Sequence, residues 1–138
     1  MPSRVFISYR REDAKWLARE IYRALGQVLP RDHVFMDVDS IPPGADFVEV
    51  LEGRVAQCDI LLALIGPGWL DVRDVKRGQC RLDNENDFVR IEIRRGLIRG
   101  IPVVPVMLDG AAIPDAAQLP DDLKRLVRRN EGDNGVGS

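Results

Sequence analysis

The chain has 138 residues, a formal net charge of −2 at pH 7, and a composition that is 45% hydrophobic and 30% charged. These values predict one globular domain with a core large enough to fold without disulfides or metals. No apolar run approaches the roughly 18 residues of a membrane helix, and residues 1–11 lack the apolar segment of a signal peptide. Charges of both signs are interspersed, which leaves no basic patch for nucleic acid. We therefore expect a cytoplasmic protein with neither a membrane nor a nucleic-acid partner.

Apolar runs alternate along the chain with helical periodicities. The predicted strands are residues 4–8, 33–38, 59–66 and 101–110. The predicted helices are residues 11–30, 47–58, 86–100 and 120–130. Asp13 is a candidate cap for the first helix, and Pro120 opens the last helix at a position that favours proline.

Strands that alternate with helices predict right-handed βαβ crossovers and an α/β fold with a mainly parallel sheet covered on both faces. The predicted domain covers residues 1–130, while residues 131–138 lack a hydrophobic pattern and are expected to be disordered. In such folds the loops after the strands and the helix N-termini share one rim, where ligands bind. We expect residues 8–13, 37–44 and 86–92 to meet at this rim.

Cysteine and histidine are too few for metal or redox chemistry. Cys58 and Cys80 form no CxxC motif and fit the unpaired thiols of a reducing compartment. His33 is the one histidine and precedes an apolar run, so we expect it at the surface or at a strand entry. The sequence predicts no metal ion and no resident cofactor.

Glu92 has an unusual place on the predicted third helix. At 100° per residue it falls beside Phe88, Val89 and Gly96, away from the basic side of the helix. An acid at the rim with apolar neighbours is a candidate catalytic carboxylate. The structural alternatives are an ion pair with Arg95, three residues on, and a favourable interaction with the helix dipole.

Five sequence segments together carry a family resemblance. They are VFISYRRED, VFMDVDSIPPG, ILLALIGPGWL, NDFVRIEI and IPVVPVMLDG. In this order and spacing they resemble the Toll/interleukin-1 receptor (TIR) domain, most closely its bacterial, NAD-cleaving branch. The resemblance extends from residue 3 to about residue 130, nearly the whole chain.

The resemblance implies a flavodoxin-like three-layer fold in which residues 39–46 form the BB loop. It also implies hydrolysis of the bond between nicotinamide and ribose in NAD, giving ADP-ribose or a cyclic isomer. Glu92 would be the catalytic residue, and Phe88 the aromatic residue four positions before it, where many relatives carry tryptophan. Such enzymes are active when assembled, so the resemblance further implies contacts with other TIR domains through the BB loop, a homo-oligomer, and a role in bacterial defence.

One carboxylate is sufficient for this reaction. Nicotinamide leaves as a neutral molecule, so no general acid is needed, while the ribosyl centre becomes oxocarbenium-like. A fixed carboxylate stabilises that positive charge or positions the attacking water, and exclusion of bulk water strengthens its field. The ring of Phe88 offers a stacking surface for the substrate, although an aromatic residue at a helix start can equally belong to the core.

Further candidate substrate-binding residues follow the first two strands. Arg10 and Arg11 carry the fork geometry that suits a pyrophosphate, or else they pair with acids such as Asp13 on the surface. The other candidates are Tyr9 at the rim, Asp37 and Asp39 as partners of ribose hydroxyls or as loop caps, and Gly44 for the turn of the BB loop.

The chain departs from the family pattern near its C-terminus. No pattern for a fifth strand follows residues 120–130, so we expect a sheet of four strands with the fourth at an exposed edge, and a sheet of five strands is the alternative. Trp69 is expected to pack over the sheet edge, and the arginines between residues 90 and 99 to form a solvated face. Two other functions fit the same pattern: a non-catalytic TIR–TIR interaction module, indifferent to Glu92, and a nucleoside deoxyribosyltransferase-like enzyme with a glutamate nucleophile.

Overall fold

The structure, a computed structural model, describes residues 3–36, 46–71, 78, 80–84 and 87–127. Its strands and α-helices are β1 (Val5–Ser8), α1 (Arg11–Leu25), β2 (Val34–Phe35), α2 (Phe47–Ala56), β3 (Ile60–Ile65), α3 (Phe88–Arg99) and β4 (Val103–Met107). Short 3-10 helices join them, namely η1 (Arg31–His33), η2 (Arg81–Asp83), η3 (Ala116–Gln118) and η4 (Asp121–Leu123).

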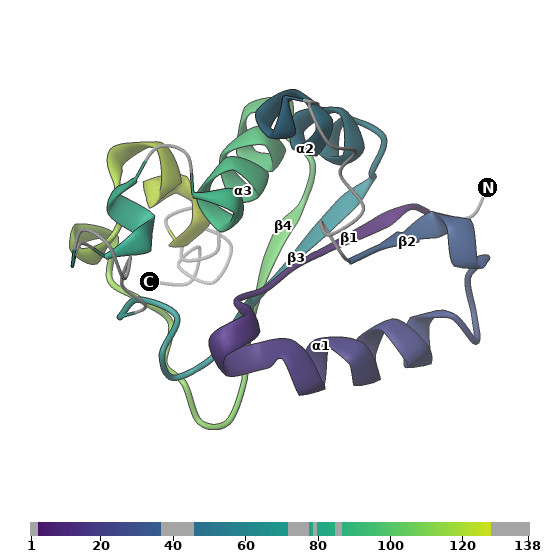
Figure 1. Ribbon diagram of the computed structural model, residues 1–138, viewed down its shortest axis with the longest axis horizontal. Coiled ribbons are helices and arrows are strands. Elements are labelled where there is room, and N and C mark those ends of the chain that lie inside the picture. Colours follow the sequence, from purple (N-terminus) through teal and green to yellow (C-terminus); the bar gives the residue numbers. More distant parts are fainter. Residues whose placement is uncertain (1–2, 37–45, 72–77, 79, 85–86, 128–138) are drawn as a thin grey trace, which may run out of the picture.

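The four strands form one parallel sheet in the order β2-β1-β3-β4. Helix α1 covers one face of this sheet, and α2 and α3 cover the other (Figure 1). This arrangement confirms the predicted α/β, flavodoxin-like fold, with a sheet of four strands among the described residues. Because the strands are parallel, the end of β1 lies at the same edge of the sheet as the loops that follow the other strands.

Two apolar clusters join the three layers. The first lies between the sheet and the pair α2 and α3 and includes Phe6 and Ile93, while the second lies under α1 and includes Ile7 and Ala18. Successive residues of β1 thus face opposite layers, which explains its uninterrupted apolar sequence. Trp69 was expected over the sheet edge but is 1% exposed and belongs to the first cluster.

Gly96 allows α3 to approach the sheet closely. A Cβ atom at this position would lie 3.1 Å from Cγ2 of Val103 and 3.3 Å from Cδ1 of Leu61. Helix α3 then ends at Gly100, whose φ of 75° is left-handed and therefore suits glycine. These two glycines fix where α3 lies and where it stops.

The first half of the chain differs from the prediction at element boundaries. Helix α1 begins at Arg11 with Arg10 as its N-cap, so Asp13 is the third helical residue and the prediction that it caps the helix is wrong. The same helix ends at Leu25, before residues 26–30 of the predicted span. His33 lies in η1, directly before β2, which agrees with its predicted place at a strand entry.

Other boundaries lie partly outside the described residues. Strand β2 covers two residues of the predicted span 33–38, of which residues 37 and 38 are not described. Pro120 is the N-cap of the 3-10 helix η4, rather than the first residue of an α-helix, and residues 124–127 continue as helix. The predicted tail at residues 131–138 is also outside the described part.

The arginines of α3 form the predicted solvated face only in part, since Arg99 is exposed and Arg95 is 37% exposed while Arg90 is largely buried. Nη1 of Arg99 donates to the carbonyl oxygens of Val55 and Cys58, each at 3.0 Å, where α2 ends. Arg90 is 12% exposed and pairs with Asp122, with its Nε 3.1 Å from Oδ1. Both side chains therefore join α3 to other parts of the fold.

Strand β4 lies at one edge of the sheet, as predicted. The N–H of Leu61 donates to the carbonyl of Pro102, and the N–H of Leu108 donates to the carbonyl of Ile65, both at 2.9 Å. Alternate residues of a strand point their polar groups to opposite sides, so Pro105 directs its hydrogen-free nitrogen away from β3. The outward row of the edge is thereby interrupted at its centre.

Candidate functional site

The candidate site lies where β1 ends and α3 begins. Asp87 is the N-cap of α3, and its side chain accepts a hydrogen bond of 3.0 Å from the backbone N–H of Arg90. This cap fixes the first turn of the helix, which carries Phe88, and places Glu92 one turn later on the same side. Glu92 is 4% exposed, and Phe88 is 39% exposed.

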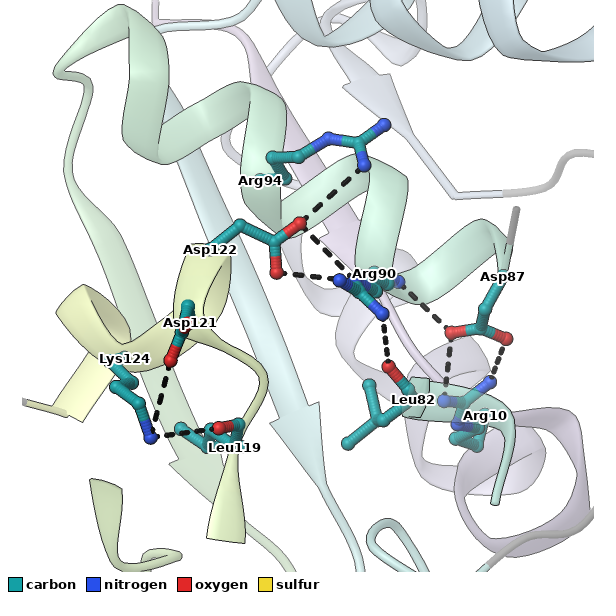
Figure 2. A network of polar contacts seen from close by, with 9 residues as sticks. All are labelled: Arg10, Leu82, Asp87, Arg90, Arg94, Leu119, Asp121, Asp122 and Lys124. Carbon is teal, nitrogen blue, oxygen red and sulfur yellow. Dashed lines mark hydrogen bonds and ion pairs between the residues drawn. The ribbon is translucent and has the colours of Figure 1, made fainter. Parts of the chain in front are cut away.

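Arg10 joins the end of β1 to this helix start. Its Nη1 and Nη2 donate to Oδ1 and Oδ2 of Asp87 at 2.6 and 2.9 Å, a bidentate pair that Figure 2 shows beside Arg90. The two side chains are 3% and 7% exposed. Planar, charge-assisted pairs of this kind are strong, and removal of one partner leaves a buried charge without compensation.

Burial dominates the chemistry of Glu92. It raises the pKa of the Glu92 carboxyl from 4.5 to about 8, and the negative charge of Asp87 acts in the same direction. The Ser8 hydroxyl and the positive charge of Arg10 both oppose this rise in pKa. At pH 7 the carboxyl is therefore mostly protonated in this conformation.

Two buried polar atoms beside Glu92 have no hydrogen-bond partner among the described residues. They are Oγ of Ser8, whose side chain is 1% exposed, and Nε of Arg10. The Ser8 hydroxyl is near enough to influence Glu92 but completes no hydrogen bond of normal geometry. Unpaired buried polar atoms are rare in folded proteins and concentrate where a ligand or water binds.

A network of ion pairs extends from this site along α3 (Figure 2). Arg90 pairs with Asp122 and donates from Nη1 to the carbonyl of Leu82 at 2.9 Å, while Nη1 of Arg94 lies 3.5 Å from Asp122. Lys124 binds the carbonyl of Leu119 at 3.0 Å. The network joins η2 and η4 to α3 and so supports the helix that carries Glu92.

The structure places some of the predicted site residues together. Arg10 lies near enough to Glu92 for its charge to act on that carboxyl, and Tyr9 is half-buried directly before Arg10. The predicted surface pairing of Arg10 with acids near it in sequence is wrong, since its partner is Asp87. The expected pair of Glu92 with Arg95 is also wrong, because Nη1 of Arg95 lies 3.8 Å from Glu52.

Other predicted site residues are only partly tested. Arg11 begins α1, but its side chain is not described. Asp37, Asp39 and Gly44 lie outside the described residues. Phe88 is 39% exposed, which excludes full burial in the core.

Sequence reasoning missed Asp87. The signal was present, because an aspartate directly before an apolar helical run is a favoured N-cap. Its contact with Arg10, 77 residues away in sequence, required the fold.

The rest of the described surface offers a different hollow, of about 710 Å³, next to α1 and β2. It does not include Glu92, and its lining residues are Arg19, Tyr22, Arg23, Gly26, Gln27, Val34 and Met36. Among the described residues no group of His, Cys, Asp and Glu could hold a metal ion. In the same part of the chain, none of the helices has the length and apolar character to cross a membrane.

The geometry places the buried carboxyl of Glu92 near the buried ion pair of Arg10 and Asp87, at the edge where the parallel strands end. The family model for the TIR domain matches residues 5–134. The chain belongs to the TIR-domain family. A search of curated proteins finds no significant relative.

Solved structures similar to this TIR domain include parts of receptors and of a resistosome. The TIR domain of the Toll-related receptor TRR-2 from Hydra magnipapillata is 16% identical, with a TM-score of 0.57, and the match covers 81% of this chain and 75% of that one. The TIR domains of the activated Roq1 resistosome, which directly recognises the pathogen effector XopQ, are also 16% identical, with a TM-score of 0.59 and coverages of 97% and 73%. A metazoan TIR-STING receptor from C. gigas is 19% identical, with a TM-score of 0.54, and this chain matches 38% of its length. At these identities the likeness establishes the fold of the domain and not its branch of the family.

Proposed function

We propose that this TIR domain is an NAD⁺ glycohydrolase in which Glu92 is the catalytic carboxylate. The observation that carries the proposal is the environment of Glu92, a carboxyl that is 4% exposed at the ligand-binding edge of the sheet, with a pKa raised to about 8 by burial. Titratable groups with such environments concentrate at functional sites. The half-exposed ring of Phe88, four residues earlier on the same side of α3, supports it.

The reaction breaks the bond between C1′ of the ribose and the ring nitrogen of nicotinamide. The bonding electron pair passes to that nitrogen, nicotinamide leaves neutral, and positive charge develops on the ribosyl centre. An ionised Glu92 stabilises this charge, and water then attacks C1′ and releases one proton to give ADP-ribose. Attack by an adenine nitrogen at the same centre would give a cyclic product.

Substrate binding would itself ionise Glu92. The nicotinamide ring of NAD⁺ is cationic, and a positive charge within a few ångströms favours the carboxylate over the acid. The carboxyl that is mostly neutral at rest would lose its proton as the ring arrives. Since little water remains at the site, the resulting charge pair would be stronger than in solvent.

The low exposure of Glu92 requires a change at the site before a dinucleotide can reach it. We propose that self-assembly supplies this change, with the BB loop at residues 39–46 contacting a neighbouring copy. The TIR domains of an activated resistosome are among the similar structures, which is the support that the comparisons offer.

The test is release of nicotinamide from NAD⁺ by purified protein, with and without a fused multimerising scaffold. Wild-type protein is compared with Glu92→Gln, which keeps the size and hydrogen-bonding capacity of the side chain. Glu52→Gln is the matched control, because Glu52 lies on the neighbouring helix α2 and is 35% exposed. Release by wild type and by Glu52→Gln, together with loss in Glu92→Gln, supports the proposal. Equal release by all three variants would remove Glu92 from the reaction.

A non-catalytic TIR–TIR interaction module is the second candidate. The near-complete burial of Glu92 favours this second function, because an acid with a purely structural role needs no access for a substrate. This function predicts that Glu92→Gln associates with other TIR domains as wild type does and that no variant releases nicotinamide in any assembly state.

A further inference from the structure

The ion pair of Arg10 and Asp87 stands next to the group that the proposed function uses. Asp87 serves both as the N-cap of α3 and as the acceptor of both terminal nitrogens of Arg10, at 2.6 and 2.9 Å. With 3% and 7% exposure, the two charges lie in a region where water screens them little. Five residues after Asp87, Glu92 projects from the second turn of the same helix.

Charged groups near Glu92 come from the elements packed on α3. From the end of β1 comes Arg10, and from α3 itself comes Asp87, and these are the charges that act on Glu92. Helix α2 contributes Glu52, which is paired with Arg95 at 3.8 Å. The 3-10 helix η4 contributes Asp122, which pairs with Arg90 and Arg94 of α3, and strands β3 and β4 contain no charged residue. The electrostatic field at Glu92 therefore depends mainly on two opposite charges that are bound to each other.

We propose that Arg10 and Asp87 are positioning residues for Glu92, because their bidentate pair holds α3 against the end of β1 and keeps two opposite charges balanced beside its carboxyl. This proposal rests on the proposed function only where it links the pair to catalysis by Glu92. The balance is a property of the fold that can be measured without substrate.

Removal of either charge should shift the pKa of Glu92 in a definite direction. Without the Asp87 carboxylate, the Arg10 guanidinium would stabilise an ionised Glu92 and lower its pKa. Without Arg10, the Asp87 carboxylate would repel that charge and raise the pKa of Glu92 further. If both partners were removed, these two opposite shifts in the pKa of Glu92 would largely cancel. The unpartnered Nε of Arg10 gives the guanidinium one more donor for an ionised carboxylate or a substrate.

The experiment follows the carboxyl carbon of Glu92 by NMR over a pH titration of the whole chain, with the resonance assigned from its loss in Glu92→Gln. Asp87→Asn keeps an acceptor for the helix cap and removes the charge, and we expect the titration midpoint to fall by about one pH unit or more. Arg10→Met keeps the volume, and we expect the midpoint to rise by a similar amount. The double variant should return to within about half a pH unit of wild type.

Asp122→Asn is the matched control. This variant breaks the pair with Arg90 in the same network, but Asp122 is not among the charges that act on Glu92. The titration midpoint of Glu92 in this variant should therefore stay at the wild-type value. If Asp87→Asn does not fold because Arg10 is left unpaired, Arg10→Met and the double variant still give the comparison, since the upward shift in the first must vanish in the second. Midpoints that do not move, or that move in the same direction in both single variants, would overturn the proposal.

Nicotinamide release as a function of pH gives a separate readout. When the domain is active, its pH profile should shift in the same direction as the NMR midpoint in each variant. If no variant cleaves NAD⁺ but the midpoints move as expected, the proposed function fails and the positioning role of the pair stands. If cleavage requires Glu92 but the midpoints do not move, the proposed function stands and the positioning role of the pair fails.

Discussion

Substitution of Glu92 by glutamine should make the domain more stable at neutral and alkaline pH. In the unfolded chain the carboxyl ionises with its ordinary pKa of 4.5, whereas in the folded domain burial raises the pKa to about 8. Between these values the folded state binds the proton and the unfolded state has lost it. Stability of the wild type should therefore fall as the pH rises through this interval. Glutamine carries no proton to lose, so its contribution does not change with pH.

The size of the effect follows from the two pKa values. At about 1.36 kcal/mol for each tenfold change, the carboxyl costs the wild type at most about 2 kcal/mol at pH 6 and at most about 4 kcal/mol at pH 8, relative to acid pH. Domains are stable by roughly 5–15 kcal/mol, so a loss of this size is easily measured.

Urea unfolding at intervals from pH 5 to pH 9 checks this expectation for wild type, Glu92→Gln and the control Glu52→Gln. The difference in unfolding free energy between wild type and Glu92→Gln should grow with pH and level off above pH 8, while the control should follow wild type. A constant difference across the whole range would mean that Glu92 ionises normally in the folded protein, and the account of a dry carboxyl would be wrong.

Three further predictions concern catalysis, reactivity and packing. The kcat/KM for NAD⁺ cleavage should rise with pH between pH 6 and pH 8, because free enzyme with ionised Glu92 is the competent form. A profile that is flat over this range contradicts this prediction. Burial, with a smaller contribution from a neighbouring aspartate, raises the pKa of the Cys58 thiol to about 12. Iodoacetamide at pH 8 should therefore label the half-buried Cys80 first and Cys58 only on unfolding, which peptide mass mapping can check. Gly96→Ala should lower the free energy of unfolding in urea by about 1–3 kcal/mol, since the added methyl group would lie 3.1 Å from Val103. A gain in stability, as helix propensity alone predicts, would show that the neighbouring side chains of the sheet move aside easily.

The fold was predictable because its two central strands, β1 and β3, are largely buried on both faces. Uninterrupted apolar runs such as residues 5–8 and 60–65 give a strong signal, and the helices between them keep their periodicity. The boundaries were less accurate, because they depend on local caps. Arg10 ends up capping α1 without a side-chain hydrogen bond, an arrangement that no cap preference predicts, while its side chain pairs with Asp87.

The site was predictable in position but not in electrostatic state. Helical geometry alone placed Glu92 beside Val89 and Gly96, and both are buried with it. That Ser8 and Arg10 would face the same carboxyl depends on how β1 lies against α3, which no local pattern encodes. Arg90 was misjudged for a similar reason, since a charged residue on a helix is usually solvated unless acids or carbonyls from distant segments meet it.

The proline at the centre of β4 limits how copies of this domain can associate. A strand added at this edge by a neighbouring molecule would find no N–H at residue 105, so its hydrogen-bond ladder would be interrupted at the centre of β4. The β4 edge is therefore less suited to the addition of a further strand than an edge with an unbroken row of donors.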